Sequence, residues 1–167
     1  VDGPPENSQA SLYIPASRAD DLAAAGFDLL GLTNNHALDA GPEGLAASAA
    51  RLQSAGIQPL QAARPVVRIV DGLKIAFLAW NEVPPSVDRS DLWLALENAR
   101  SQADILIVML HWGWEYQRHP NQVQRSLADE LLAAGADLVL GSHPHVVQDL
   151  HFAPPAEPGG GARLVAY

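Results

Sequence analysis

The chain has 167 residues, of which 48% are hydrophobic, and its 19 acidic side chains against 10 lysines and arginines leave a formal net charge of −9. This composition is sufficient for a buried core and excludes a disordered, fibrous or coiled-coil chain. The acidic balance argues against nonspecific binding to a nucleic-acid backbone, which requires clustered positive charge. Because the sequence has no cysteine, disulfides, thiolate zinc sites and cysteine nucleophiles are excluded as well.

Apolar runs alternate with helical segments in the first half of the chain. The predicted elements, in chain order, are a helix over 16–25, a strand over 27–32, a helix over 42–54, a weak strand over 57–60, and hairpin strands over 66–70 and 73–80. Asp71 and Gly72 lie between the hairpin strands, where this dipeptide favours a tight type I′ turn.

The second half continues the alternation. The predicted elements are a helix over 91–102 with Ser90 as N-cap, a strand over 104–110, a helix from an Asn121 cap to residue 134, a strand over 137–140, and an apolar run at 164–167. Residues 154–161 are of low complexity and predict a surface loop. Strands that alternate with helices indicate a layered α/β domain, to which the hairpin adds an antiparallel element.

Three polar clusters follow directly after three of the predicted buried strands. The clusters occupy residues 33–36, 111–115 and 142–145. Ligands of layered α/β folds bind beyond the carboxyl ends of the strands. If the three strands are parallel neighbours in one sheet, the three clusters lie at one edge and their side chains meet.

The clusters hold four of the six histidines, His36, His111, His143 and His145. Neutral imidazole is a common ligand of transition metals, and Asn35 offers an amide oxygen beside them. The neighbouring His36 can point elsewhere and donate a proton. The alternative interpretation is that these histidines are hydrogen-bonded structural residues without a metal.

Other residues of the clusters allow two interpretations each. Trp112, Trp114 and Tyr116 either cover the core or form a wall for a substrate. Glu115 is a solvated loop residue, a ligand or a residue that supports a ligand, and Asp39 either caps the helix at 42–54 or orients His36. The candidates for contact with substrate or for support of the ligands are Asn34, Asp39, Trp112 and Glu115.

Three segments resemble signatures of a known family, and they occur in the family order over nearly the whole chain. They are GFD at 26–28 with TNNHALDAG at 33–41 and GL at 44–45, HWGWEY at 111–116, and GSHPHV at 141–146. They resemble the bacterial CapA-type capsule synthesis proteins, the poly-γ-glutamate biosynthesis family, which is similar to the calcineurin-like metallophosphoesterases. The resemblance implies an α/β fold with four α-β-β-α layers.

The resemblance also implies a role for each matched residue. Asn35, His111, His143 and His145 would hold two divalent metal ions, with one of the last two histidines on each metal, and His36 would be the catalytic histidine that protonates the leaving group. Two features depart from the metallophosphoesterase pattern, namely the inserted Ser142 and the proline between the paired histidines.

The family pattern begins with a strand ending in Gly-Asp and a segment ending in Asn-Leu-Glu, and neither is found in this sequence. The residues from Val165 to Tyr167 resemble the start of a longer motif. We therefore expect residues 1–167 to form one CapA-like domain cut at both ends, without some carboxylate ligands of its metals.

The leading functional hypothesis is a capsule or poly-γ-glutamate biosynthesis protein with a dinuclear metal-dependent hydrolase site, acting on an anionic polymer or a phosphoester. The alternative is a non-catalytic component of polymer assembly or export. Both hypotheses allow other capsule synthesis proteins as partners and exclude nucleic acid. They imply a bacterial protein located outside the cytoplasm or anchored to a membrane, with membrane association only through a segment outside this sequence.

Overall fold

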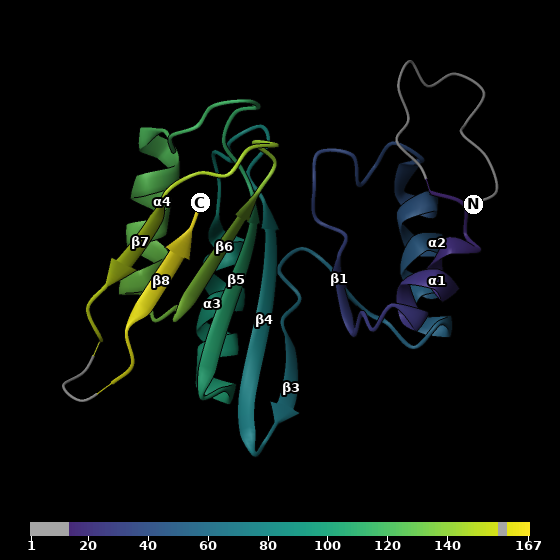
Figure 1. Ribbon diagram of the computed structural model, residues 1–167, viewed down its shortest axis with the longest axis horizontal. Coiled ribbons are helices and arrows are strands. Elements are labelled where there is room, and N and C mark those ends of the chain that lie inside the picture. Colours follow the sequence, from purple (N-terminus) through teal and green to yellow (C-terminus); the bar gives the residue numbers. More distant parts are fainter. Residues whose placement is uncertain (1–13, 157–159) are drawn as a thin grey trace.

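The computed structural model describes residues 14–156 and 160–167 (Figure 1). In this part of the chain the elements follow the order α1 (Arg18–Ala24), β1 (Leu29–Gly31), α2 (Gly41–Ser54), β2 (Gln58–Leu60), β3 (Val66–Val70), β4 (Leu73–Asn81), α3 (Ser90–Gln102), β5 (Ile105–His111), α4 (Gln122–Ala133), β6 (Leu138–Ser142), β7 (Leu150–Ala153) and β8 (Arg163–Ala166).

The larger sheet has six strands in the order β3-β4-β5-β6-β8-β7. The four inner strands β4, β5, β6 and β8 are parallel, and the outer strands β3 and β7 pair antiparallel to their neighbours. Because β5 and β6 are parallel neighbours in register, the ends of both strands lie together, with His111 opposite Ser142.

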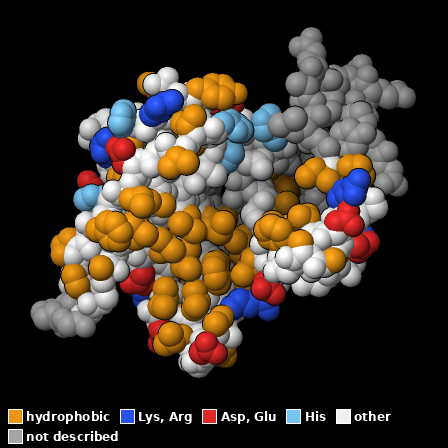
Figure 2. Space-filling model, in the orientation of Figure 1, with side chains coloured by type: hydrophobic (Ala, Val, Ile, Leu, Met, Phe, Trp, Pro, Cys, Tyr) orange, Lys and Arg blue, Asp and Glu red, His pale blue; other side chains and the backbone are white. Residues whose placement is uncertain are grey.

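Helices α3 and α4 cover one face of this sheet (Figure 1). Alternate residues of β5, including Leu106, Val108 and Leu110, are buried against Leu92 and Leu131 of these helices. Each such side chain contributes roughly 1.5–3 kcal/mol by leaving water. The intervening residues of the sheet are only half-buried, and they form a broad apolar surface on the other face (Figure 2).

The first two helices pack on a separate, smaller sheet. Strands β1 and β2 pair in parallel, and Ala19, Leu52 and Ile57 form a small core between them and helices α1 and α2. A parallel bridge between Ala62 and Ala79 links the end of this unit to β4. The expectation that the strand before cluster 33–36 shares a sheet with the other two is therefore wrong, because β1 pairs with β2 instead.

Several predicted local features are confirmed. Asp71 and Gly72 have φ angles of 50° and 85°, as the hairpin turn requires. The side chain of Asn121 accepts a hydrogen bond from Gln124 N at the start of α4, and Gln124 Oε1 accepts one from Asn121 N, which completes a capping box.

Two local predictions differ from the structure. Ser90 is the first residue of α3 and not its N-cap, because the Asp88 carboxylate accepts from Ser90 N (2.9 Å) just before the helix. Strand β7 has no counterpart among the predicted elements, and it lies on the edge of the sheet with exposed side chains. The predicted loop over 154–161 falls partly on 157–159, outside the described residues.

The predicted α/β class is confirmed, with a six-stranded sheet under two helices and a second small sheet under two more. Among the residues that the structure describes, no helix has both the length and the apolar character to cross a membrane.

Candidate metal centre

The loops after β1, β5 and β6 converge on one place. His111 Nε2 lies 2.9 Å from Asn35 Oδ1, although these residues are 76 positions apart. The ring centroid of His143 is 4.7 Å from that of His111 and 6.0 Å from that of His145. The structure thus brings together the four residues predicted as metal ligands, even though β1 belongs to another sheet.

The β6 loop carries its two histidines on a strained backbone. His143 and His145 have φ angles of 99° and 58°, which L residues rarely adopt and which cost roughly 1–3 kcal/mol each. Between them, Pro144 O accepts a hydrogen bond from Tyr116 N (2.7 Å), which ties this loop to the one after β5. The two imidazole planes are inclined by 56° to each other.

A chain of hydrogen bonds orients His36 and Asn35. His36 Nδ1–H donates to Asp39 Oδ2 (3.0 Å), which leaves Nε2 as an acceptor for Asn35 Nδ2 at 3.3 Å. Asn34 Oδ1 accepts from His36 N (2.9 Å) and fixes the loop. Asp39 therefore contacts His36, and the N-cap residue of α2 is Ala40. The amide of Asn35 consequently presents its oxygen to His111.

A second chain of hydrogen bonds fixes the tautomer of His111. The Ser142 hydroxyl donates its single proton to Leu110 O (3.0 Å), so its oxygen accepts from His111 Nδ1–H at 3.1 Å. His111 Nε2 then carries a lone pair, and it faces the lone pairs of Asn35 Oδ1. Two acceptors at 2.9 Å repel each other, and a cation between or beside them removes that repulsion.

Two imidazoles of the cluster, His111 and His143, have a lowered pKa. Burial, and then the neighbouring His143, His36 and His145, lower the pKa of His111 to about 4. Burial also lowers the pKa of His143, although Glu115 acts in the opposite direction. Neutral imidazole is the form that binds metals. The donor set of imidazole nitrogens and an amide oxygen therefore fits a divalent transition metal.

Glu115 lies at the exposed side of the cluster. Its Oε1 is 3.9 Å from His145 Nε2, and the ligand atoms of Glu115, His143 and His145 all lie within 4.8 Å of one another. The side chains of His145 and Glu115 retain 59% and 48% of their exposure, so solvent reaches this side of the cluster.

The aromatic residues of 111–116 divide between the two predicted roles. Trp112 is buried in the main core and stacks on Tyr167 (5.5 Å between centroids), so it covers the core. Trp114 and Tyr116 are exposed, and the Tyr116 ring stacks on His145 at 6.0 Å. Trp112 is 1% exposed, so it has almost no surface with which to contact a substrate.

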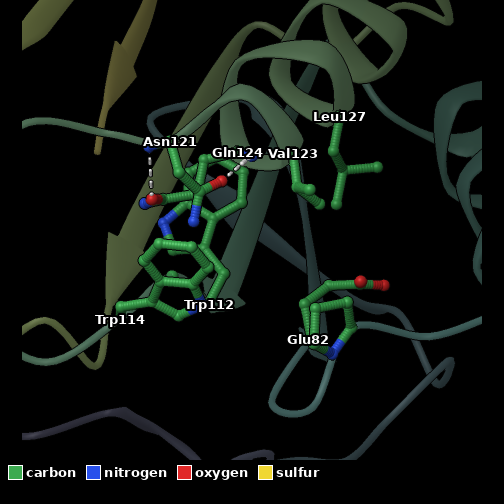
Figure 3. Close-up of a pocket in the computed structure, with 9 residues that line it drawn as sticks. Glu82, Trp112, Trp114, Asn121, Val123, Gln124 and Leu127 are labelled. Carbon is green, nitrogen blue, oxygen red and sulfur yellow. Dashed lines mark hydrogen bonds between the residues drawn. The ribbon is translucent and has the colours of Figure 1, made fainter.

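A small pocket lies beside the cluster, between the loop after β5 and the start of α4 (Figure 3). It is lined by Glu82, Pro85, Trp112, Gly113, Trp114, Asn121, Val123, Gln124 and Leu127. None of the described histidines lines it, so we treat the pocket and the histidine cluster as separate features.

Sequence reasoning misses the functional contribution of two residues. Ser142 stands in the sequence as an insertion, yet it orients His111 across two strands. Glu82 falls between predicted elements, yet its carboxylate is 2% exposed and accepts from Arg89 and Trp80 beneath the cluster. The contact of Ser142 with His111 depends on the pairing of β5 with β6, whereas the partners of Glu82 lie within the segment 80–89.

Comparisons with known proteins point to one family. Residues 2–167 match the family model described as "Bacterial capsule synthesis protein PGA_cap". The chain is 32% identical over 145 residues to the PGA biosynthesis protein CapA of Bacillus subtilis, a match that covers 74% of this chain and 38% of that protein. It is 29% identical over 148 residues to the capsule biosynthesis protein CapA of Bacillus anthracis, covering 74% and 36% respectively.

A probable polyglutamine synthesis accessory protein of Mycobacterium tuberculosis is 32% identical over 147 residues, covering 68% of this chain and 38% of that protein. The matches thus span well under half the length of these curated relatives. The crystal structure of a hypothetical protein from Thermus thermophilus is similar with a TM-score of 0.56 and 21% identity, covering 80% of this chain and 52% of that one, which establishes the likeness of fold.

Proposed function

Because the chain belongs to the family of bacterial capsule synthesis proteins, we propose that it contributes a metal-dependent hydrolase site to the synthesis of capsule or poly-γ-glutamate. The substrate class would be an anionic polymer or a phosphoester. The observation that carries this proposal is the convergence of Asn35, His111, His143 and His145 beside the Asp39–His36 pair.

The candidate ligand residues lie close together. His111 Nε2 and Asn35 Oδ1 present lone pairs to each other, and His143 and His145 add two imidazoles within ring-contact distance. These residues would hold the metals, two of them in the proposed site. Bound divalent metals would supply Lewis-acid polarisation of the scissile centre and a nucleophile at neutral pH.

His36 is placed to act as the general acid. Its Nδ1–H donates to the Asp39 carboxylate, which holds the ring in one orientation. Its Nε2 is then the nitrogen that takes up a proton and delivers it to a leaving group. The side chain keeps 40% of its exposure, so a substrate can approach it from solvent.

The charge of the chain favours a metal-assisted site over simple binding of a polyanion. At a net charge of −9, the chain as a whole repels an anionic polymer. Bound cations would invert the local potential at the cluster. The bacterial relatives and their printed roles support a bacterial protein that works with capsule synthesis proteins. We further propose that it acts outside the cytoplasm or at a membrane.

The first test of this proposal is metal content. The double variant His143→Ala/His145→Ala should lose bound metal in a titration with Mn²⁺ or Co²⁺, whereas His151→Asn on the exposed strand β7 should retain it. Unchanged metal stoichiometry in the double variant would exclude the proposed site.

The second test is turnover by the metal-loaded chain on phosphodiesters and γ-glutamyl amides. His36→Asn should lower the rate by about 10²–10⁴-fold while the metal content stays constant. Metal binding without hydrolysis of either class would instead support the non-catalytic role in assembly or export.

A further inference from the structure

We propose that Glu115 is a direct ligand and that it forms, with His143 and His145, a self-sufficient site for one divalent metal ion. The observation behind this proposal is that one ligand atom from each of these residues lies within 4.8 Å of the other two. The inference rests on the proposed function only in that both require the two histidines to bind a metal. It differs from the family resemblance, which assigns these histidines to two different metals.

The three ligand atoms lie within 4.8 Å of one another, so the side chains must move closer together to close around an ion. Bonds of about 2.0–2.2 Å in a tetrahedral site place the ligand atoms roughly 3.4 Å from one another. His145 Nε2 and Glu115 Oε1 are 3.9 Å apart, which is too long for a hydrogen bond and about 0.5 Å more than a shared metal requires. Both side chains are exposed, so a rotation of either one supplies the difference.

The backbone around Glu115 is held firmly, which places its carboxylate beside the β6 loop. The next residue, Tyr116, donates its N–H to Pro144 O (2.7 Å) and stacks its ring on His145. Its φ angle of 60° is strained, which is typical of segments held in place for a function. The two loops therefore approach each other at the residues that flank the proposed ligands.

A buried pair of glutamines anchors the far end of the same loop. Gln148 Nε2 donates to Gln117 O (2.7 Å), and Gln148 Oε1 accepts from Gln124 Nε2 (3.0 Å). Gln124 also fills the space beside Gly113, where a Cβ would lie 2.8 Å from its side chain. The loop that carries Glu115 is thus fixed at both ends to α4 and to the β6 loop.

The charges also suit a cation. Glu115 is the negative charge that opposes the lowering of the His143 pKa, so its field acts at that ring. One carboxylate and two neutral imidazoles leave a divalent ion with a single net positive charge, which is adequate to attract an anionic substrate. The neutral pair of Asn35 and His111 offers no such compensation, so the two parts of the cluster should differ in affinity.

The test is titration of the full chain with Co²⁺, followed by calorimetry and by the d–d absorption of the bound ion. Glu115→Gln should weaken Co²⁺ binding by about 100-fold or more and should change the absorption band. Removal of a residue that only supports a ligand typically weakens metal binding by about 10- to 100-fold. Glu97→Gln, which alters an exposed glutamate on α3, is the matched control and should bind as the wild type does.

A second variant tests whether the site is self-sufficient. Asn35→Ala/His111→Ala should still bind one Co²⁺ with its own d–d absorption band, and adding Glu115→Gln should abolish that binding. If Glu115→Gln leaves both affinity and absorption unchanged while His143→Ala/His145→Ala loses the metal, the inference is overturned and the proposed function survives. If the wild-type chain binds no Co²⁺, both are overturned. A weaker affinity with an unchanged band would reduce Glu115 to a supporting role and overturn the direct ligation.

Discussion

Single hydrogen atoms decide what the cluster can bind. The Ser142 hydroxyl has one proton, and because Leu110 O takes it, His111 must donate from Nδ1 and keep Nε2 unprotonated. The same reasoning applied to Asp39 makes the other ring, His36, an acceptor at Nε2. Ser142 and Asp39, at the edge of the cluster, therefore determine that His111 Nε2 and Asn35 Oδ1 face each other with their lone pairs.

Removing the Ser142 hydroxyl should therefore weaken metal binding. We expect Ser142→Ala to lower the Co²⁺ affinity about 10- to 100-fold, because His111 loses the acceptor that fixes its tautomer and ring orientation. Ser142→Thr keeps the hydroxyl and should restore most of the affinity, and Ser101→Ala on the exposed end of α3 should have no effect. Calorimetric titration measures all three, and wild-type affinity in Ser142→Ala would refute the orienting role.

The buried ion pair beneath the cluster should matter for stability. Glu82 accepts from Arg89 Nε (2.9 Å) and from a second Arg89 nitrogen (3.0 Å). Arg89→Met leaves a buried carboxylate without its cation and should cost about 3 kcal/mol in the free energy of unfolding at pH 7. Urea unfolding measures this, with Arg64→Met, whose guanidinium donates to the side chain of Gln61 in an exposed hydrogen bond, as the control that should stay within about 0.5 kcal/mol.

The cost of Arg89→Met should depend on pH with a defined sign. Burial by itself raises the pKa of Glu82, but the donors of Arg89, Ser86 and Trp80 together outweigh burial and hold the pKa below its ordinary value of 4.5. A lowered folded-state pKa contributes stability that is present above the unfolded value and is lost as the pH falls through the folded value. The difference between wild type and variant should shrink from pH 5 toward acid, and a constant difference would contradict this account.

The candidate ligands were predictable because their chemistry is visible in the sequence. Histidines and an asparagine directly after apolar runs predict a site at strand ends, and the structure places Asn35, His111, His143 and His145 together. The contact of Ser142 with His111 was not predictable in the same way, because it depends on the register of two strands 31 residues apart.

At the scale of elements, the end of β6 is the most tightly packed part of the site. Gly141 lies between the β6 core residues and the histidine loop, and a Cβ there would overlap Trp112 Nε1 and lie 2.6 Å from the Tyr167 carbonyl carbon. The glycine allows Trp112 to pass under the strand. The position of the following loop therefore depends on a residue without a side chain.

Gly141→Ala should consequently destabilise the chain by about 1–3 kcal/mol, the usual cost of overpacking, and should lower the affinity for Co²⁺ because the loop moves. Gly31→Ala is a matched control, since Gly31 also lies in a strand and a Cβ there meets no heavy atom within 4 Å. Thermal unfolding and metal titration of both variants check the prediction. Equal effects of the two substitutions would show that the packing under Gly141 is unimportant.

Local elements were predicted well where their signals are short-range. The turn at Asp71 and the cap at Asn121 each follow from a few neighbouring residues. The sheet to which β1 belongs was predicted wrongly, because strand partners are chosen by tertiary packing and the three-residue strand has no distinguishing pattern. Strand β7 was missed because it has only four residues and lies at the edge of the sheet.

At the scale of the molecule, helices α3 and α4 cover one face of the six-stranded sheet, and no described helix packs on the other face. In the described residues, Ile107, Met109 and Leu140 point away from α3 and α4 and remain half-buried on the apolar surface seen in Figure 2. Their strands have the continuous apolar character that is typical of sheets covered on both faces. The sequence predicted the strands at β5 and β6, but composition does not identify which element covers each face, and these strands are fully buried on one face only.

The two sheets of the molecule meet at the proposed metal centre, which gives metal binding a consequence for the whole chain. Asn35 belongs to the unit of β1, β2, α1 and α2, whereas His111 ends β5 of the six-stranded sheet. An ion held by both would link the two units. The ion on Glu115, His143 and His145 would stabilise the six-stranded sheet without involving the smaller unit.

Hydrogen exchange should separate these two effects. Co²⁺ at about 100 times its dissociation constant should stabilise the wild-type chain by about 2.7 kcal/mol and slow amide exchange in both units. In Asn35→Ala the stabilisation of β5 and β6 should persist, while the metal no longer slows exchange in β1 and β2. Exchange in β1 and β2 that responds to metal equally in both proteins would show that the units are coupled by their packing alone, without a contribution from the Asn35 oxygen.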